Sequence, residues 1–261
     1  MAETNWKTSL TDIGPNRIRV RGYDIAEIMS RLTYAEAVFL LLKGELPSKA
    51  EGELMNAILV SSIDHGASPP SALGTRAVVS GGNSLNAAIA GGILVIGDWH
   101  GGAIEQAAKI MQQWAGKLDG NSANVEQIAQ DMAVWLKEKK IRMPGFGHRI
   151  HTADPRTPKL FEIAEKHGYS GKHIKLCRAL EKALAAQLGK ALPINVDGAI
   201  AAVISDMGFD WRLGKAFFII SRVPGLVAHA YEEMTREKPV RKLGPLPYEY
   251  DGPPDREIGR G

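Results

Sequence analysis

Five short segments of the sequence place ionisable side chains beside glycine, proline or apolar residues. They are IDHGAS with His65, GDWHGGA with His100, PGFGHRIHTADPR with His148, Arg149 and Arg156, INVDGA with Asp197, and ISRVPG with Arg222. Imidazole and carboxylate groups are the usual general acids and bases, and guanidinium groups bind carboxylates through paired hydrogen bonds. Each segment falls at the end of a predicted helix, where free N–H groups and the helix dipole favour anions. These places are therefore suited to holding an anion beside acid–base groups.

From the residues alone, each of these side chains also has a structural interpretation. Asp197 precedes Gly198 and can simply cap a helix that begins at residue 198. A single histidine at a helix end is usually a hydrogen-bonded packing residue, and Arg222 can be a buried ion-pair partner or a snorkelling side chain. Histidines without a glycine or proline setting are interpreted as structural or surface residues: His151, His167, His173 and His229.

A metal site is not indicated. No two histidines lie four residues apart on one helical face, and Cys177 is the single cysteine, so there is no cysteine pair to bind a metal. The same cysteine count excludes an internal disulfide and fits a reducing compartment.

The composition is that of an ordinary soluble protein. With 261 residues, 44% of them apolar and 23% charged, the chain can build a substantial core. The net charge is only +3 and no dense Lys/Arg run occurs, so nucleic acid is not an expected partner. No apolar signal core and no apolar span of 18 residues are found, so no membrane segment is expected and a cytoplasmic location is predicted.

The elements that position these residues are predicted to be helices. A short alternating segment at 16–24 indicates a small ribbon, and then helical periodicity takes over. Thr33 with Glu36 and Ser48 with Glu51 match capping boxes, which predicts helix starts near residues 34 and 49. The first of these helices is expected to end before Gly44.

The remaining helices follow from apolar stripes and caps. Segment 83–97 is apolar nearly all round, which predicts a central helix packed closely by its neighbours. Thr157 before Pro158 predicts a capped helix start. Further helices are predicted over 103–118, 124–139, 198–208 and 211–235, with another along the Ile174 stripe and a bend at Pro224 in the last.

The predicted fold is mainly α and forms one domain over residues 1–261. We expect a larger part made of 1–119 and 216–240 and a smaller lobe at about 120–215. The tail at 238–261 is rich in proline and glycine and is expected to run extended, draped over a partner subunit where one is present.

In their order along the chain, these segments resemble the citrate synthase superfamily. RGYDIAEI followed by AVFLLLKGELP resembles its N-terminal signature, and DHG, HGGA, PGFGHR with DPR, NVDG and SRVPGLVAH resemble its active-site segments. One departure is large: family synthases carry a long helical block before the first histidine, whereas here residues 48–64 provide a single helix. This compact, citrate synthase-like form with a shortened N-terminal half resembles the citryl-CoA lyase module at the C-terminus of ATP-citrate lyase. His100 is more typical of the synthases.

The resemblance implies a role for each site residue. Asp197 would move the proton of the acetyl methyl group, His100 would donate to the enolate oxygen, and His148 would serve the keto or hydroxyl oxygen of the other substrate. The glycines at 101 and 102 would allow close approach of substrate. Carboxylate-binding residues would be His65, Arg156 and Arg222, and residues near the CoA thioester and phosphates would be Gly145, Phe146, Gly147 and Arg149.

A further family arginine reaches across from a second subunit within an Arg-Pro motif. Here Lys238-Pro239 stands at the corresponding place, so Arg241 or Arg236 is the expected substitute. The resemblance thus implies a homodimer or higher homo-oligomer, with a CoA thioester as substrate and no permanently bound cofactor.

The expected activity is cleavage of citryl-CoA to acetyl-CoA and oxaloacetate. The alternative is a short citrate or 2-methylcitrate synthase that condenses acyl-CoA with oxaloacetate. A third hypothesis is a non-catalytic subunit that binds CoA or a tricarboxylate. If the chain is a lyase, a separate protein is expected to make its citryl-CoA, because 261 residues leave no room for the ATP-using part.

Overall fold

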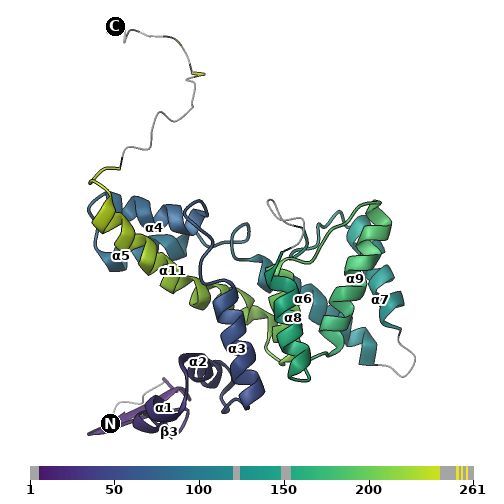
Figure 1. Ribbon diagram of the computed structural model, residues 1–261, viewed down its shortest axis with the longest axis horizontal. Coiled ribbons are helices and arrows are strands. Elements are labelled where there is room, and N and C mark those ends of the chain that lie inside the picture. Colours follow the sequence, from purple (N-terminus) through teal and green to yellow (C-terminus); the bar gives the residue numbers. More distant parts are fainter. Residues whose placement is uncertain are drawn as a thin grey trace.

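The computed structural model of the chain describes residues 6–119, 124–147 and 154–241 and, in the tail, residues 251, 252, 254 and 257. Helices dominate this part of the chain, and the mainly α fold predicted from the periodicity is confirmed. In Figure 1, helices α4, α5 and α11 form one side of the molecule, and α7 and α9 lie at the opposite side. None of the helices in the described ranges combines the length and the apolarity needed to span a bilayer.

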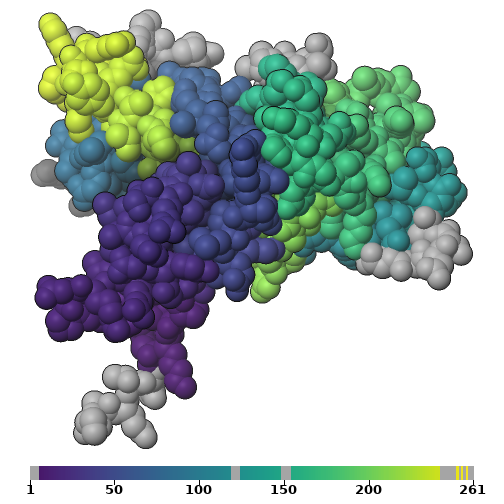
Figure 2. All heavy atoms as spheres, turned by 60° about the horizontal axis from the view of Figure 1, so that its bottom comes forward, coloured from purple at the N-terminus to yellow at the C-terminus, as the bar shows by residue number. Residues whose placement is uncertain are grey.

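The N-terminal segment forms a small antiparallel sheet in the order β1-β2-β3. Its strands are β1 (Thr11–Gly14), β2 (Arg17–Val20) and β3 (Tyr23–Asp24). The ribbon predicted over 16–24 is therefore present and gains one strand before it. Helix α1 (Ile25–Arg31) follows directly, and the whole N-terminal segment projects from the body in purple in Figure 2.

Both predicted capping boxes are confirmed. Helix α2 (Tyr34–Lys43) begins after Thr33, and α3 (Lys49–Ser61) begins after Ser48, each with reciprocal bonds to the glutamate three residues on. These bonds satisfy N–H groups that a helix start otherwise leaves without partners. Helix α2 ends at Gly44, as predicted.

Three helices pack together beside the N-terminal part: α4 (Pro70–Ser80), α5 (Leu85–Leu94) and α11 (Gly214–Arg236). Helix α4 was not predicted, and α11 runs on through Pro224. The prediction that 83–97 is a central helix is wrong for the single chain. Only Ala88 and Gly92 of α5 are buried, and Leu94 is 83% exposed. An apolar pattern shows which side chains avoid water but not which element covers them.

The main core surrounds α6 (Ala103–Ala115) and α10 (Val196–Asp206), which pack against each other. A short 3-10 turn (Gly116–Asp119) extends α6, and another (Trp211–Leu213) precedes α11. The helices that complete this region are α7 (Val125–Glu138), α8 (Arg156–Lys166) and α9 (Lys172–Leu188). Helix α10 is buried along almost its whole length, so it is the true central helix.

Two predicted helix starts differ from the structure. Helix α8 begins at Arg156, and the Thr157 hydroxyl donates to the carbonyl of Ile194 at 3.1 Å instead of capping the helix. Helix α10 begins at Val196, two residues earlier than predicted. A tertiary partner, which the local sequence does not reveal, decides how the Thr157 side chain is used, whereas α10 starts earlier because Asn195 caps it.

Candidate active site

One cavity of about 840 Å³ brings together five of the predicted site residues. They are His100, Gly147, Arg156, Asp197 and Arg222. They are contributed by different elements and lie up to 122 positions apart in the chain, so only the tertiary fold unites them. His148 and Arg149 lie outside the described residues.

Asp197 lies in the first turn of α10. The helix is capped by Asn195, whose Oδ1 accepts the N–H groups of Asp197 at 3.0 Å and Gly198 at 3.3 Å. The interpretation of Asp197 as a cap is therefore wrong, and its carboxylate is available to the cavity. Burial raises the pKa of Asp197 to about 6; the charge of Asp154 adds to this, while Arg156 and Arg222 oppose it.

The loop that leads to His148 is joined to the start of α10 by backbone hydrogen bonds. The Gly145 carbonyl accepts from Asn195 N–H at 3.0 Å, and the Gly147 N–H donates to Pro193 at 2.7 Å. A Cβ atom on Gly145 would lie 2.5 Å from Gly198 Cα, and Gly145 has a φ of +79°. Glycine is thus required here for contact between two protein segments.

Phe146, in the same loop, points away from solvent. Its side chain is 3% exposed and belongs to the main hydrophobic core. Of the described residues between α7 and His148, Arg142 and Gly147 line the cavity. The side chain of Phe146 anchors the loop.

His100 stands just before α6, with its ring turned to the first turn of α4. Its Nε2 lies 2.8 Å from Ser71 Oγ and accepts the Ser71 N–H at 3.4 Å. An amide N–H can only donate, so Nε2 is the acceptor and the neutral ring carries its proton on Nδ1. Burial, together with the charge of Arg222, lowers the pKa of His100 and keeps the ring neutral at pH 7.

Phe218 of α11 separates His100 from Arg222. Its ring meets the imidazole edge-on at a centroid distance of 5.4 Å, and the Arg222 guanidinium lies 4.9 Å from its centroid. Gly101 has a φ of +85°, and a Cβ there would come within 2.5 Å of the Phe218 ring. The packing of Phe218 is therefore a sufficient reason for glycine at position 101.

Three arginines line the cavity, and two of them, Arg156 and Arg222, meet at the C-terminal end of α3. Arg156 Nη1 donates to the Ser61 carbonyl at 3.2 Å, and Arg222 Nε donates to the Ser62 carbonyl at 3.0 Å. The dipole at a helix C-terminus favours cations. Arg222 is only 3% exposed, and its Nη1 has no hydrogen-bond partner among the described residues. A buried donor left in this state, on the wall of a cavity, indicates an anionic ligand.

Arg156 is also paired with Asp154. Its Nε and Nη2 donate to the two oxygens of this carboxylate at 2.9 and 2.8 Å. Burial raises the pKa of Asp154, but the hydrogen bonds from Arg156 and from the Val196 N–H outweigh burial and hold the pKa below its ordinary value. Asp154 was not among the predicted site residues.

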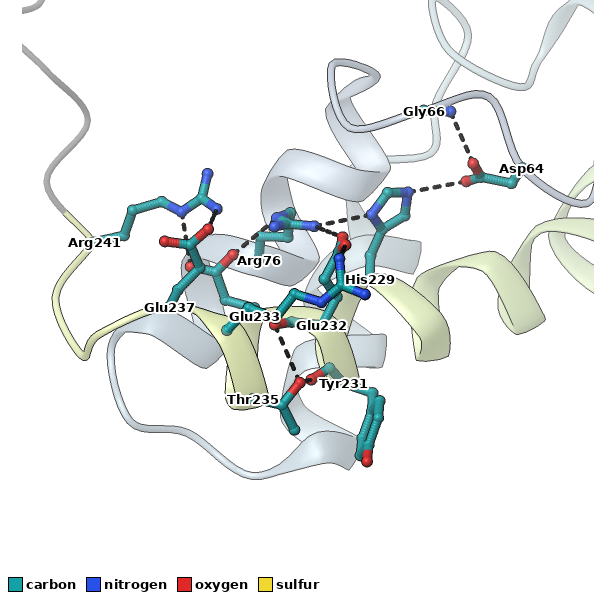
Figure 3. A network of polar contacts seen from close by, with 11 residues as sticks. Asp64, Gly66, Arg76, His229, Tyr231, Glu232, Glu233, Thr235, Glu237 and Arg241 are labelled. Atoms are coloured by element: carbon teal, nitrogen blue, oxygen red, sulfur yellow. Dashed lines mark hydrogen bonds and ion pairs between the residues drawn. The ribbon is translucent and has the colours of Figure 1, made fainter.

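The loop at 62–69 borders the cavity through Ser62, Ser68 and Pro69, and His65 lies on it with an exposed side chain. Asp64 holds this loop: it accepts the Gly66 N–H at 2.8 Å and pairs with His229 Nε2 at 3.0 Å. Figure 3 shows this pair at one end of a longer polar network.

The network continues from His229 to the end of α11. His229 Nδ1 lies 3.1 Å from Arg76 Nη1. Arg76 can only donate, so Nδ1 is the acceptor and the ring proton lies on Nε2, which donates to Asp64 of the loop. Arg76 Nε lies 2.8 Å from the buried carboxylate of Glu233, which also pairs with Arg241 at 3.0 Å (Figure 3). His229, interpreted from the sequence as structural or surface, thus fixes the loop that carries His65.

Arg241 and Arg236 lie outside the cavity of their own chain. Arg241 pairs with Glu237 at 2.5 Å in addition to Glu233, and Arg236 pairs with Glu232 at 2.6 Å. Both belong to the C-terminal end of α11 and the residues just after it. Their expected role toward a second subunit remains a prediction.

Within residues 6–119, 124–147 and 154–241, no three or more His, Cys, Asp or Glu side chains gather in a way that could hold a metal ion.

Comparison with known proteins places this geometry in a family. Residues 1–54 and 48–243 match the family model described as citrate synthase, C-terminal domain. The chain belongs to the citrate synthase family. It is 30% identical over 244 residues to citrate synthase 2 of Bacillus subtilis (strain 168), a match that covers 91% of this chain and 61% of that protein. The resemblance identified from the sequence motifs is confirmed.

Solved structures give the same fold. The chain is 46% identical to citryl-CoA lyase from Hydrogenobacter thermophilus, with a TM-score of 0.90 and 98% of both chains covered. ATP citrate lyase from Methanothrix soehngenii is 21% identical with a TM-score of 0.84; the match covers 100% of this chain and 44% of that one, and at this identity it shows the fold alone. The chain spans 61% and 57% of the length of the curated citrate synthases from Bacillus subtilis and Haloferax volcanii.

Several residues of the site were missed in the sequence. Asn195 and Asp154 lie inside the quoted segments NVDG and DPR, so their polar type beside a helix start was an available signal. Ser71 gave none, because a serine early in an unpredicted helix has no distinguishing pattern. Phe218 looked like any apolar residue of a helical stripe.

Proposed function

We propose that this protein is a citryl-CoA lyase, which cleaves citryl-CoA into acetyl-CoA and oxaloacetate. The observation that carries the proposal is the full-length match, in both directions, to a chain described as citryl-CoA lyase, at 46% identity. The cavity supports it, because the half-buried Asp197 carboxylate, a neutral imidazole and three arginines line it together. The substrate is a CoA thioester, and no resident cofactor is required.

The arginines bind the carboxylates of the citryl group. Arg222 offers a buried Nη1 that has no hydrogen-bond partner in the described part of the chain, and Arg156 adds a second guanidinium on the same wall. His65 joins them from the 62–69 loop. A citryl group carries two free carboxylates beside its thioester, so two cations on one wall neutralise the charge that enters the cavity.

Cleavage begins at the hydroxyl group of citryl-CoA. His148 takes the hydroxyl proton, the C–O bond becomes a carbonyl, and the C–C bond breaks. Its electron pair moves into the thioester carbonyl, which becomes an enolate. His100 donates its Nδ1–H to the enolate oxygen, because its Nε2 is occupied by Ser71.

Asp197 completes the reaction by giving its proton to the enolate carbon, which becomes the methyl group of acetyl-CoA. For this step the carboxyl group must hold a proton at the start, and burial raises its pKa to about 6. His148 has gained the proton that Asp197 has lost, so the pair holds one proton before and after cleavage. The same groups run the condensation in reverse.

A short citrate synthase is the second candidate. It is favoured by His100 and by the 30% identity to citrate synthase 2 of Bacillus subtilis (strain 168). A synthase performs the same carbon–carbon step and then hydrolyses the thioester. The two functions therefore differ in the products formed from citryl-CoA.

The deciding experiment incubates the purified protein with citryl-CoA. A lyase releases acetyl-CoA and oxaloacetate, which malate dehydrogenase and NADH detect as they form. Free citrate and CoA as the main products would refute the lyase assignment and establish the synthase. If neither citryl-CoA nor acyl-CoA with oxaloacetate were turned over, the non-catalytic binding role would be left.

We infer that the protein works as a homodimer in the cytoplasm. Apolar side chains of α4 and α5 are left in solvent in the single chain, among them Leu73 at 52%, Leu85 at 43% and Leu94 at 83% exposure. An exposed apolar face of this kind is typical of a subunit interface. Across it, Arg241 or Arg236 of one chain would complete the site of the other. Within each chain, we place the cavity between the larger part, residues 1–119 and 216–240, and the smaller lobe at about 120–215.

A further inference from the structure

The segment Asp154-Pro155-Arg156 forms a local hydrogen-bonded unit, and the same arrangement is found at Asp210-Trp211-Arg212. In the first copy, Asp154 accepts the backbone N–H of Arg156 at 3.1 Å and its Nε and Nη2 at 2.9 and 2.8 Å. In the second copy, Asp210 accepts the same three groups of Arg212 at 2.8, 2.8 and 2.7 Å. An aspartate two residues before an arginine at a helix start therefore folds into this unit through local bonds.

The two copies differ in their surroundings. Arg212 is exposed, with a side chain at 73%, whereas the Asp154 side chain is only 1% exposed. Asp154 Oδ2 also accepts the N–H of Val196 at 3.0 Å, the first residue of α10. All four acceptor positions of this carboxylate are thus used, and the fourth bond joins it to the helix that carries Asp197.

The pairing leaves a defined part of Arg156 for a ligand. A guanidinium has five N–H groups, of which the Nε–H and one on Nη2 bind Asp154 and one on Nη1 binds the Ser61 carbonyl. Within the described residues, one N–H on Nη1 and one on Nη2 have no further partner. Because Arg156 lines the cavity, these groups can bind a substrate carboxylate there.

We propose that Asp154 is the positioning residue of this site, holding the carboxylate-binding N–H groups of Arg156 and the Asp197 end of α10 with one buried carboxylate. The inference rests on the proposed function, since it assigns these two groups to one reaction. The group that binds substrate and the group that transfers the proton would both be held by the Asp154 carboxylate. The exposed Asp210–Arg212 unit has the same local geometry and lacks both connections.

Three variants separate the parts of this proposal. Asp154→Asn turns one acceptor oxygen into an NH₂ group that faces N–H donors, so both connections weaken. Val196→Pro removes the N–H that reaches Asp154 and replaces the buried valine side chain by an apolar ring. Proline is favoured at the first helical position, and Asn195 already has extended backbone angles. Asp210→Asn is the matched control, because it disrupts the same local unit away from the cavity.

The readouts are oxaloacetate binding by calorimetry, kcat for citryl-CoA cleavage, and the pH profile of kcat/KM. Asp154→Asn is expected to weaken oxaloacetate binding about tenfold or more and to lower kcat about tenfold or more, because charged donors lose their partner. In the pH profile of kcat/KM of this variant, the limb that reports Asp197 moves to lower pH, because the charge of Asp154 raises the pKa of Asp197 in the wild type. Val196→Pro lowers kcat and leaves oxaloacetate binding within about twofold, and Asp210→Asn changes neither.

Each outcome distinguishes this inference from the proposed function. A wild-type protein that neither binds oxaloacetate nor cleaves citryl-CoA refutes the proposed function. An active wild type with Asp154→Asn folded, equally active and equally able to bind oxaloacetate refutes the positioning role. If Asp154→Asn does not fold, an unchanged kcat in Val196→Pro overturns the link to α10.

Discussion

At the scale of single residues, the site depends on two opposite pKa shifts that share one cause. Burial in the same cavity raises the pKa of the Asp197 carboxyl and lowers that of the His100 imidazole. Each shift favours the uncharged form. A carboxyl that holds its proton up to about pH 6 and can give it to carbon is then combined in one cavity with a neutral imidazole that can donate to an enolate.

The Asp197 shift has a consequence for stability. Ionising this carboxyl in the folded chain is unfavourable, so the folded state binds the extra proton between pH 4 and 6, and stability falls as pH rises through that window. A rise of about two pKa units corresponds to roughly 3 kcal/mol. We therefore expect Asp197→Asn to be more stable than wild type at pH 7, by up to about 3 kcal/mol, while turnover falls a hundredfold or more. Urea unfolding at pH 4 and pH 7 tests this, and an equal difference at both pH values would contradict it.

His100 is expected to be neutral with its proton on Nδ1. Nitrogen NMR of the imidazole at pH 7 should show an unprotonated Nε2, because the Ser71 amide donates to that atom. His100→Ala should lower turnover a hundredfold or more with a modest change in oxaloacetate affinity. His173, which pairs with Asp206 at 2.8 Å and does not line the cavity, provides the control histidine: His173→Gln should keep most of the turnover. An Nε2–H signal assigned to His100 would refute the assigned donor.

At the scale of elements, the site is assembled by helix ends. The C-terminus of α3 binds both arginines through the carbonyls of residues 61 and 62, and the N-terminus of α10 presents Asp197. Helix α3 is the single helix between α2 and the loop at 62–69, as predicted from the sequence. Its C-terminal end positions two of the cations of the cavity.

The contact between Gly145 and Gly198 joins two catalytic segments and should tolerate no side chain. A Cβ on Gly198 would lie 2.4 Å from the Gly145 carbonyl oxygen, so Gly198→Ala must push the loop away from α10. We expect a loss of about 2 to 4 kcal/mol in unfolding free energy and a large loss of turnover. Gly116→Ala, where no atom lies within 4 Å of the added Cβ, is the control and should be neutral or slightly stabilising. Equal stability of both variants in thermal unfolding would show that the contact is unimportant.

At the scale of the whole molecule, the exposed apolar face of α4 and α5 is the face that we propose a second copy covers. The same side of the molecule carries the C-terminal end of α11, where the buried pair of Arg76 and Glu233 fixes the start of the tail through Arg241 (Figure 3). A dimer across this face would link the tail of one chain to the site of the next.

Leu94→Glu places a charge at the most exposed of these apolar positions, at 83%. We expect the dimer to dissociate, which sedimentation velocity measures as a change to the mass of one chain, and turnover to fall if Arg241 or Arg236 acts across the interface. Val134→Glu on α7, on the opposite side of the molecule and 52% exposed, should leave the oligomer intact. A Leu94→Glu protein that sediments like wild type would exclude this face as the interface.

The sequence by itself determined two kinds of feature: helix starts that depend on local hydrogen bonds, and the family, which depends on the order of the motifs. The capping boxes at Thr33 and Ser48 predicted helix starts correctly because their hydrogen bonds span three residues. The order of the motifs was sufficient for the family, and with it the roles expected of His100, Asp197, Arg156 and Arg222.

Only the tertiary structure decided how those side chains are held. Asp154 and Asp210 form the same local unit, yet one is buried against α10 and the other is exposed, and nothing in three residues distinguishes them. Ser71 became the partner of His100 because α4 packs beside the loop before α6. The exposed position of α5 at one side of the molecule was likewise not predictable. An apolar pattern indicates that a helix will be buried, whereas long-range packing decides which element covers it.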